Sequence, residues 1–188
     1  MERRTLSFSP EKFCTRAEDG NLYIEGYFAV FGSTYELWEG AIETIAPGAF
    51  DGALAGDIRA LINHDTTLVL GRTIAGTLAL RVDERGLWGS ILINQNDQDA
   101  MNLYYRVQRG DVTQCSFGFE ILKEEREELP DGTIRWTLIS VKLYEVSVCT
   151  FPAYEETGVQ ARKNEVETIR QRKMEAWRAA AHARLKGE

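Results

Sequence analysis

Apolar and polar side chains alternate along much of the first 161 residues, and this alternation predicts strands. The longest run covers residues 22–31, which are rich in aromatic and β-branched side chains. Residues 57–63 repeat the pattern, with Ile58, Ala60 and Ile62 at a period of two. The pattern therefore predicts a chain dominated by strands up to residue 161.

Two further pairs of apolar runs are each separated by a short polar segment that favours a tight turn. Each pair predicts a hairpin of antiparallel strands. The first pair is 74–82 and 87–93 around Asp83-Glu84-Arg85-Gly86, and the second is 115–122 and 133–150 around Pro130-Asp131-Gly132.

Two stretches interrupt the strands with helical spacing. Residues 97–109 carry apolar side chains at i, i+3, i+4 and i+7, with Asn96 or Asp97 to cap the start and Gly110 to end the helix. A shorter helix is expected to open at Pro47, with Phe50 and Leu54 one turn apart.

The character of the chain changes after Pro152. Residues 163–186 contain no Pro or Gly, and their apolar side chains recur at spacings of three and four. We expect two parts, a domain of residues 1–161 and a helical tail of residues 162–188. The plainer alternative is an ordinary C-terminal helix packed on its own domain.

Charge is divided unevenly between these parts. The net charge is −7, while residues 162–188 hold eight Lys or Arg against four Asp or Glu, a balance of +4, which leaves −11 on residues 1–161. A nucleic-acid-binding surface along the whole chain is not expected on such a charge.

Composition narrows the location and the chemistry. No apolar stretch approaches the roughly 20 residues of a membrane span, and the first residues lack the apolar core of a signal peptide. Three cysteines are an odd number without metal-ligand spacing, which favours a reducing cytoplasm over a disulfide framework. We therefore expect neither a membrane partner, nor a metal, nor a cofactor.

His64 is the candidate general base. The sequence has two histidines, and His182 lies in the predicted tail. His64 follows the apolar run 60–62 at the end of a predicted strand, where a lone histidine is more often structural. In a histidine-dependent hydrolase it would have to be the base, because imidazole accepts and returns a proton near neutral pH.

Ser116 is the candidate nucleophile. In a strand, Cys115, Phe117 and Phe119 would point to one side, toward the core, while Ser116 and Gly118 would point to the other. A small Ser beside a Gly leaves open space for a substrate backbone. Cys115 is the stronger nucleophile, but its phenylalanine neighbours indicate that it is buried.

A third group should orient the imidazole and stabilise its positive charge. Glu145 interrupts an otherwise apolar predicted strand, and a half-buried carboxylate needs a partner. His64 would be that partner in a catalytic site, and Arg72 or Lys142 in a structural one. Ser147 on the same face could also orient the ring, and Asp65 ranks lower because it adjoins His64 in sequence.

An oxyanion site is also required for a tetrahedral intermediate. Gly71-Arg72 and the backbone near Ser116 are the candidates, and sequence alone does not choose between them.

These segments together, in this order and spacing, resemble the prohead serine protease family of tailed phages over about residues 20–160. The matching segments are Gly26-Tyr27-Phe28-Ala29-Val30-Phe31, Ile45-Ala46-Pro47-Gly48-Ala49-Phe50, Asn63-His64-Asp65 with Leu70-Gly71-Arg72, Gly110-Asp111-Val112 with Ser116-Phe117-Gly118-Phe119, and Glu145-Val146-Ser147 with Phe151-Pro152-Ala153-Tyr154.

The resemblance implies a catalytic set of His64, Ser116 and Glu145. It also implies a β-rich α+β fold like that of the herpesvirus assembly proteases, with a mostly antiparallel β-barrel surrounded by a few helices. Those relatives use a second histidine as third member, and this chain has none in the expected barrel.

The activity implied is that of a maturation endopeptidase. Such an enzyme would act inside the immature prohead, in the host bacterial cytoplasm, and would cut the scaffolding segment of the major capsid protein and often itself. Self-association into a dimer is a further expectation from the herpesvirus enzymes. The basic tail would bind acidic scaffold or be a self-cleaved targeting piece.

Two alternatives remain at this point. A non-catalytic assembly or scaffold module could keep the same barrel, and it would bind capsid protein without depending on Ser116. A cysteine-dependent hydrolase could use Cys115, and thiol alkylation would then abolish its activity.

Overall fold

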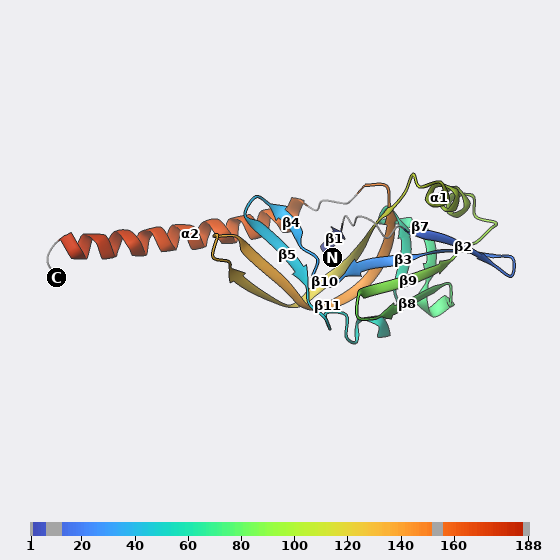
Figure 1. The fold of residues 1–188 in the computed structure, drawn as a ribbon, viewed down its shortest axis with the longest axis horizontal. Coiled ribbons are helices and arrows are strands. Elements are labelled where there is room, and N and C mark those ends of the chain that lie inside the picture. Colours follow the sequence, from blue (N-terminus) through green and yellow to red (C-terminus); the bar gives the residue numbers. More distant parts are fainter. Residues whose placement is uncertain (1, 7–12, 152–155, 186–188) are drawn as a thin grey trace. The chain divides into compact units, whose positions relative to one another are not determined.

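The computed structural model describes residues 2–6, 13–151 and 156–185. The chain separates into two units, Met1–Tyr154 and Glu155–Glu188. Among these described residues, the first unit contains the strands and one α-helix, and the second contains one long helix (Figure 1). Each unit is described by itself.

A seven-stranded sheet is built around one long hairpin of strands β10 and β11, which pair antiparallel. The strands β1 and β4 lie at the ends of the path β1-β10-β11-β5-β4, and β6 and β7 branch from β11. The bounds are β1 Glu2–Leu6, β4 Tyr35–Trp38, β5 Ala41–Ile45, β6 Arg59–Ile62, β7 Asp65–Arg72, β10 Gln114–Glu128 and β11 Ile134–Cys149.

Both β5 and β6 run parallel to β11 and pair with it at different levels. β5 pairs with Ile134–Leu138 of β11, and β6 pairs with Glu145–Val148 farther along. The segment that connects β5 to β6 passes the part of β11 that lies between these two pairings. There Val141 of β11 donates its N–H to the carbonyl of Ala49. Strand β6 therefore lies beside the end of β11.

A second, four-stranded antiparallel sheet has the order β2-β3-β9-β8. Its strands run side by side in Figure 1. One hydrophobic core joins both sheets, because buried side chains of β3, β9, β10 and β11 belong to the same cluster. The bounds are β2 Cys14–Glu18, β3 Asn21–Val30, β8 Leu78–Val82 and β9 Gly86–Leu92.

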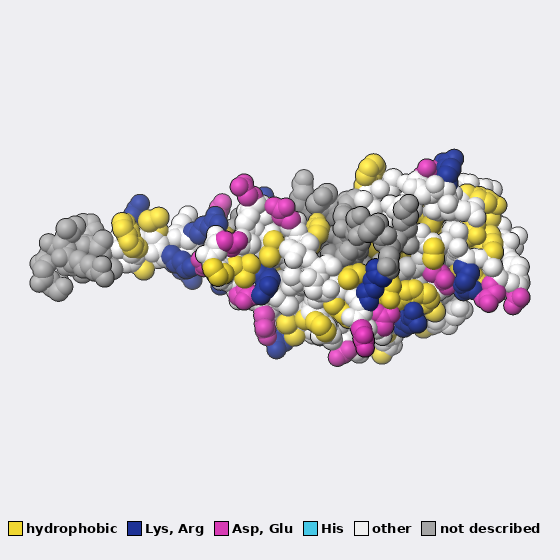
Figure 2. Space-filling model, viewed as in Figure 1, with side chains coloured by type: hydrophobic (Ala, Val, Ile, Leu, Met, Phe, Trp, Pro, Cys, Tyr) yellow, Lys and Arg dark blue, Asp and Glu magenta, His cyan; other side chains and the backbone are white. Residues whose placement is uncertain are grey.

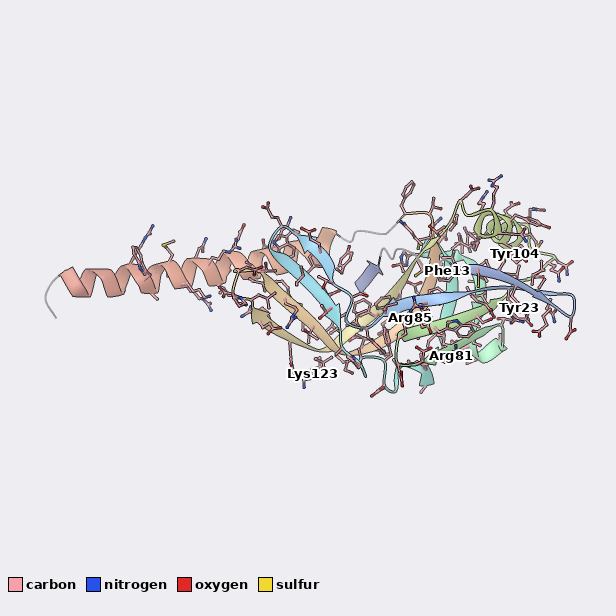
Figure 3. All side chains as sticks on the ribbon, viewed as in Figure 1. Phe13, Tyr23, Arg81, Arg85, Tyr104 and Lys123 are labelled. Carbon is pink, nitrogen blue, oxygen red and sulfur yellow. The ribbon has the colours of Figure 1, made fainter. Side chains whose placement is uncertain are left out.

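The outer face of the four-stranded sheet carries arginines stacked on aromatic rings. The guanidinium carbons lie 4.0 to 4.5 Å from the ring centroids, within the range of cation–π contacts. The pairs are Arg16 on Tyr23, Arg81 on Trp88 and Arg85 on Tyr27, and Figure 3 labels Tyr23, Arg81 and Arg85. Basic and acidic side chains are intermixed on the face shown in Figure 2.

The predicted helix at 97–109 is confirmed as α1, Gln98–Arg109. The Asp97 side chain accepts hydrogen bonds from the N–H groups of Asp99 and Ala100, and Gly110 ends the helix at φ 88°. The predicted tail helix is α2, Glu156–Leu185. The expected division at residue 161 stays a prediction.

The helix predicted from Pro47 is wrong. This segment forms turns followed by a short 3₁₀ helix, η1 Ala53–Ala55, because Gly48 and Gly52 adopt φ values of +89° and +75° that an α-helix does not contain. The run 74–82 also begins with a 3₁₀ helix, η2 Thr73–Ala75, so its strand starts only at Leu78.

Both predicted hairpins are confirmed, as β8–β9 and β10–β11. The fold is β-rich α+β, as expected. The described residues form two sheets with open edges, however, and the closed barrel is not what they show. No helix among the described residues is long and apolar enough to cross a membrane.

Candidate active site

Strands β10 and β11 carry four residues of the candidate site on one face of the seven-stranded sheet. Ser116 of β10 lies opposite Ser147 of β11, and Gly118 lies opposite Glu145. Since alternate residues of a strand share a face, all four project to the same side of the sheet. Cys115, Phe117 and Phe119 project to the other side and are buried in the core, as the sequence predicted.

His64 lies in the two-residue turn that joins β6 to β7. Ile62 pairs with Asp65, and the residues between them, Asn63 and His64, have φ values of 50° and 62°. Two positive φ values in a two-residue hairpin loop are the mark of a type I′ turn, which favours Asn followed by Gly. A His at the second position costs about 1–2 kcal/mol of backbone strain.

The turn is held against the end of β11. Asn63 donates its N–H to the carbonyl of Val148 over 3.1 Å, and its side-chain oxygen accepts from the N–H of Thr150 over 2.8 Å. The backbone N–H of His64 donates a hydrogen bond to Ser147 Oγ over 3.2 Å. These bonds fix the position from which the imidazole extends.

The imidazole is bound to Glu145 inside the protein. His64 Nδ1 and Glu145 Oε1 are 2.7 Å apart, and both side chains are almost fully buried. Ser147 Oγ donates to the other carboxylate oxygen, Oε2, over 2.6 Å. Because both oxygens of an ionised carboxylate only accept, Nδ1 carries the proton, and in the neutral ring Nε2 then keeps its lone pair.

The remaining ring nitrogen is in a position to act. His64 Nε2 is buried and has no hydrogen-bond partner among the residues that the structure describes. Buried polar atoms are rarely left in this state, and such an atom calls for an explanation. An imidazole held by a carboxylate through Nδ1, with Nε2 unengaged, is the arrangement of a general base.

Ser116 lies one strand away from this pair. It is fully buried, and its cross-strand partner Ser147 contacts both His64 and Glu145. Directly opposite side chains in an antiparallel pair have Cβ atoms about 4.5–5.5 Å apart. The structure therefore brings His64 and Glu145 into direct contact and sets Ser116 on the same face beside them.

Gly118 makes room for the Glu145 side chain, and not for a substrate backbone as the sequence predicted. The space above it does not lie open for a substrate, because the carboxylate of Glu145 fills it. A Cβ at position 118 would lie 2.3 Å from Glu145 Oε1. The sequence pattern showed a small residue beside Ser116 but gave no sign of what covers it.

A model of the caudovirus prohead serine protease family matches residues 11–172. The chain belongs to this family. It is 33% identical over 173 residues to the prohead protease of enterobacteria phage HK97, covering 89% of this chain and 72% of that protein. Its fold is similar to that of the bacteriophage T4 capsid assembly protease, with a TM-score of 0.51 at 13% identity, covering 80% of this chain and 97% of that one.

The remaining candidates are Asp65 for orienting the imidazole and Arg72 or Lys142 as a structural partner of Glu145, and each of them has a different partner. Asp65 accepts from the N–H and hydroxyl of Thr67. Arg72 binds Asp57 over 2.7 Å and lowers the pKa of that carboxyl. The ammonium of Lys142 lies over the ring of Tyr144. Ser147 positions the Glu145 carboxylate and the His64 backbone rather than the ring.

The oxyanion site, with Gly71-Arg72 and the backbone near Ser116 as its candidates, stays a prediction. The side chain of Arg72 is engaged with Asp57, and Arg72 pairs with Arg59, whose strand separates it from Glu145 of β11. Among the described residues, no group of three His, Cys, Asp or Glu side chains is arranged to hold a metal ion.

A cavity of about 430 Å³ lies between the segment that connects β5 to β6 and residues Val141–Tyr144 of β11, which precede Glu145. Its walls combine apolar side chains with the polar groups of Lys142 and Tyr144. The apolar and acidic lining residues include Leu122, Val141, Leu143, Asp51 and Asp57.

The two buried cysteines of the protease are expected to resist alkylation. Burial raises the pKa of the Cys115 thiol far above its ordinary value and that of Cys149 to about 12. At pH 8 roughly one Cys149 in 10⁴ is then a thiolate, the form that reacts. Iodoacetamide should modify only the exposed Cys14 in the folded protein and all three cysteines after unfolding, as counted by intact mass.

Fast modification of Cys115 in the folded protein, with loss of activity, would instead support the cysteine-dependent alternative.

Proposed function

We propose that this chain is a prohead maturation endopeptidase that uses Ser116 as nucleophile, His64 as general base and Glu145 as the group that orients and stabilises the imidazole. The observation that carries the proposal is the buried His64–Glu145 pair on the Ser116 face, with Nε2 unengaged among the described residues. Membership of a serine protease family agrees with this reading of the geometry.

The chemistry follows the order of the contacts. His64 Nε2 takes the proton of Ser116 Oγ as the oxygen attacks the scissile carbonyl carbon. The imidazolium so formed keeps its Nδ1–H on Glu145 Oε1, and the carboxylate stabilises the new positive charge. Nε2 then returns the proton to the leaving amine, and water hydrolyses the acyl-enzyme by the same route.

The bond from Ser116 to Nε2 is expected to form when substrate binds. Catalytic hydrogen bonds are often long in a free enzyme and tighten only in the complex.

The substrate is proposed to be the major capsid protein with its scaffolding segment, cut inside the immature prohead in the host cytoplasm. This follows from the family match to prohead serine proteases. Self-association of the protease and cleavage of its own chain remain predictions of the same proposal.

The proposal is tested by co-expressing the protease with the capsid protein of its phage and measuring the intact masses of both chains. The wild type should trim the capsid protein, and the Ser116→Ala variant should leave it at full mass. Equal trimming by both would reject Ser116 as nucleophile. Co-assembly without trimming by either would favour the non-catalytic assembly module.

Gly118→Ala is expected to lower kcat/KM by about 100-fold, the loss that a displacement near 1 Å produces in a catalytic site. The new methyl group would overlap Glu145 Oε1, which must then move away from His64. Cleavage of a peptide spanning a mapped capsid-protein site measures the effect. Gly56→Ala is the matched control, since a Cβ there would meet only the Ala53 carbonyl at 3.9 Å.

If Gly118→Ala cleaved as fast as Gly56→Ala, the Glu145 carboxylate would not need its present position.

The tail is proposed to bring the protease to the assembling prohead. Helix α2 belongs to the basic part of the chain, and its Met174 and Trp177 side chains are exposed, three residues apart. Removing residues 163–188 should reduce the amount of protease found in purified proheads, measured against capsid protein. Unchanged incorporation would reject this role.

A further inference from the structure

The strand that carries Ser116 has a second neighbour besides β11. Strand β1, Glu2–Leu6, pairs antiparallel with the other edge of β10, where Thr5 lies opposite Ser116 and Arg3 opposite Gly118. Within the described residues β1 pairs with β10 alone, so it forms the edge of the sheet. A segment from the start of the chain thus runs along the backbone of the proposed nucleophile strand.

An extended peptide could pair with this edge of β10 beside Ser116, as β1 does. The opposite edge is held by β11 over its whole length beside the site. A protease must hold several substrate residues in an extended form, and pairing with a sheet edge satisfies their backbone groups while alternate side chains enter pockets. Strand β1 makes this type of pairing with the residues Cys115–Phe119.

We propose, building on the function above, that the edge of β10 at Cys115–Phe119 is the binding site for the extended substrate peptide, and that β1 occupies it as an internal competitor. Substrate then enters by displacing β1 and taking the same antiparallel place. The enzyme is competent only in the fraction of molecules with β1 displaced, so the apparent affinity for substrate falls by that fraction.

Strand β1 has the properties of a displaceable strand. It is five residues long, pairs with one strand among the residues that the structure describes, and carries the polar sequence Glu2-Arg3-Arg4-Thr5. A short tether gives such a segment an effective concentration in the millimolar range. Dilute capsid protein would not displace it, whereas the crowded substrate inside a prohead would.

The test places a proline at each of two adjacent positions of β1, Arg4→Pro and Thr5→Pro, in the full chain. Successive N–H groups of a strand point to opposite edges, so one proline removes a hydrogen bond to β10 and the other removes an N–H that faces away. The two variants are therefore matched controls for each other. KM and kcat are measured with a peptide spanning a capsid cleavage site mapped by the co-expression experiment.

One of the two variants should lower KM by about fivefold at unchanged kcat, the effect of losing one hydrogen bond, while its neighbour stays within about twofold of wild type. A free peptide of sequence Glu-Arg-Arg-Thr-Leu should inhibit competitively, and more strongly in the variant with weakened β1. Unchanged KM in both variants, or non-competitive inhibition by the peptide, would overturn the inference. Cleavage that survives Ser116→Ala would instead overturn the proposed function.

Discussion

Replacing Ser116 by alanine is expected to lower kcat/KM by about 10⁵-fold, because the nucleophile of a serine protease supplies most of its rate enhancement. The substitution removes one buried oxygen and leaves the His64–Glu145 pair intact, so the protein should fold as before. The measurement is the rate of cleavage of a capsid-protein peptide, beside the unfolding temperature of each variant.

Ser147→Ala is the matched control. Ser147 is also fully buried and lies directly opposite Ser116 on the same face. Its loss removes the hydrogen bond to Glu145 Oε2, and a bond to a charged group is worth about 1.5–3 kcal/mol, so we expect a fall of about 10- to 100-fold. If Ser147→Ala abolished cleavage and Ser116→Ala did not, the two serines would exchange roles.

The hairpins and helix α1 could be predicted because their determinants are local. Asp83 accepts backbone hydrogen bonds from Arg85 and Gly86 in the first turn, and Asp97 and Gly110 cap α1 through their own side chain and backbone. The helix predicted after Pro47 was wrong because the apolar side chains have helical spacing while the glycines adopt positive φ values. Periodicity indicates which side chains are buried, but it does not indicate the backbone φ angles.

The way the sheets assemble could not be predicted in the same manner. Whether strands close into a barrel depends on which edges pair, and both β5 and β6 pair with the same edge of β11 at different levels. Hydrophobic alternation is the same for a strand in a barrel and in an open sheet. The closed barrel came from the resemblance alone, and the β-rich composition came from the pattern.

The pairing of His64 with Glu145 was predictable because a buried carboxylate must have a partner. These residues are 81 positions apart, and their contact depends on β6 running parallel to β11. The type I′ turn at Asn63-His64 was not predicted from the sequence, although Asn at the first central position favours this turn. A strained histidine in a position that favours glycine is itself typical of a functional site.

Substitution of Glu145 distinguishes a catalytic role of this side chain from a structural role. Glu145→Gln keeps the shape of the side chain and an oxygen for the His64 Nδ1–H, but it removes the negative charge. We expect kcat to fall by about 10³-fold with little change in KM, because the amide cannot stabilise the imidazolium of the transition state.

A matched variant, Glu43→Gln, tests whether any buried glutamate of this sheet would behave in the same way. Glu43 of β5 is as deeply buried as Glu145 and belongs to the same sheet, but its strand pairs with the far part of β11. Its variant should keep kcat within about twofold, whatever it does to stability. Equal losses of kcat in both variants would mean that Glu145 supports the fold and not the chemistry. The positive charge on His64 develops only as the proton arrives in the transition state. Loss of the Glu145 carboxylate charge should therefore appear in kcat before it appears in binding.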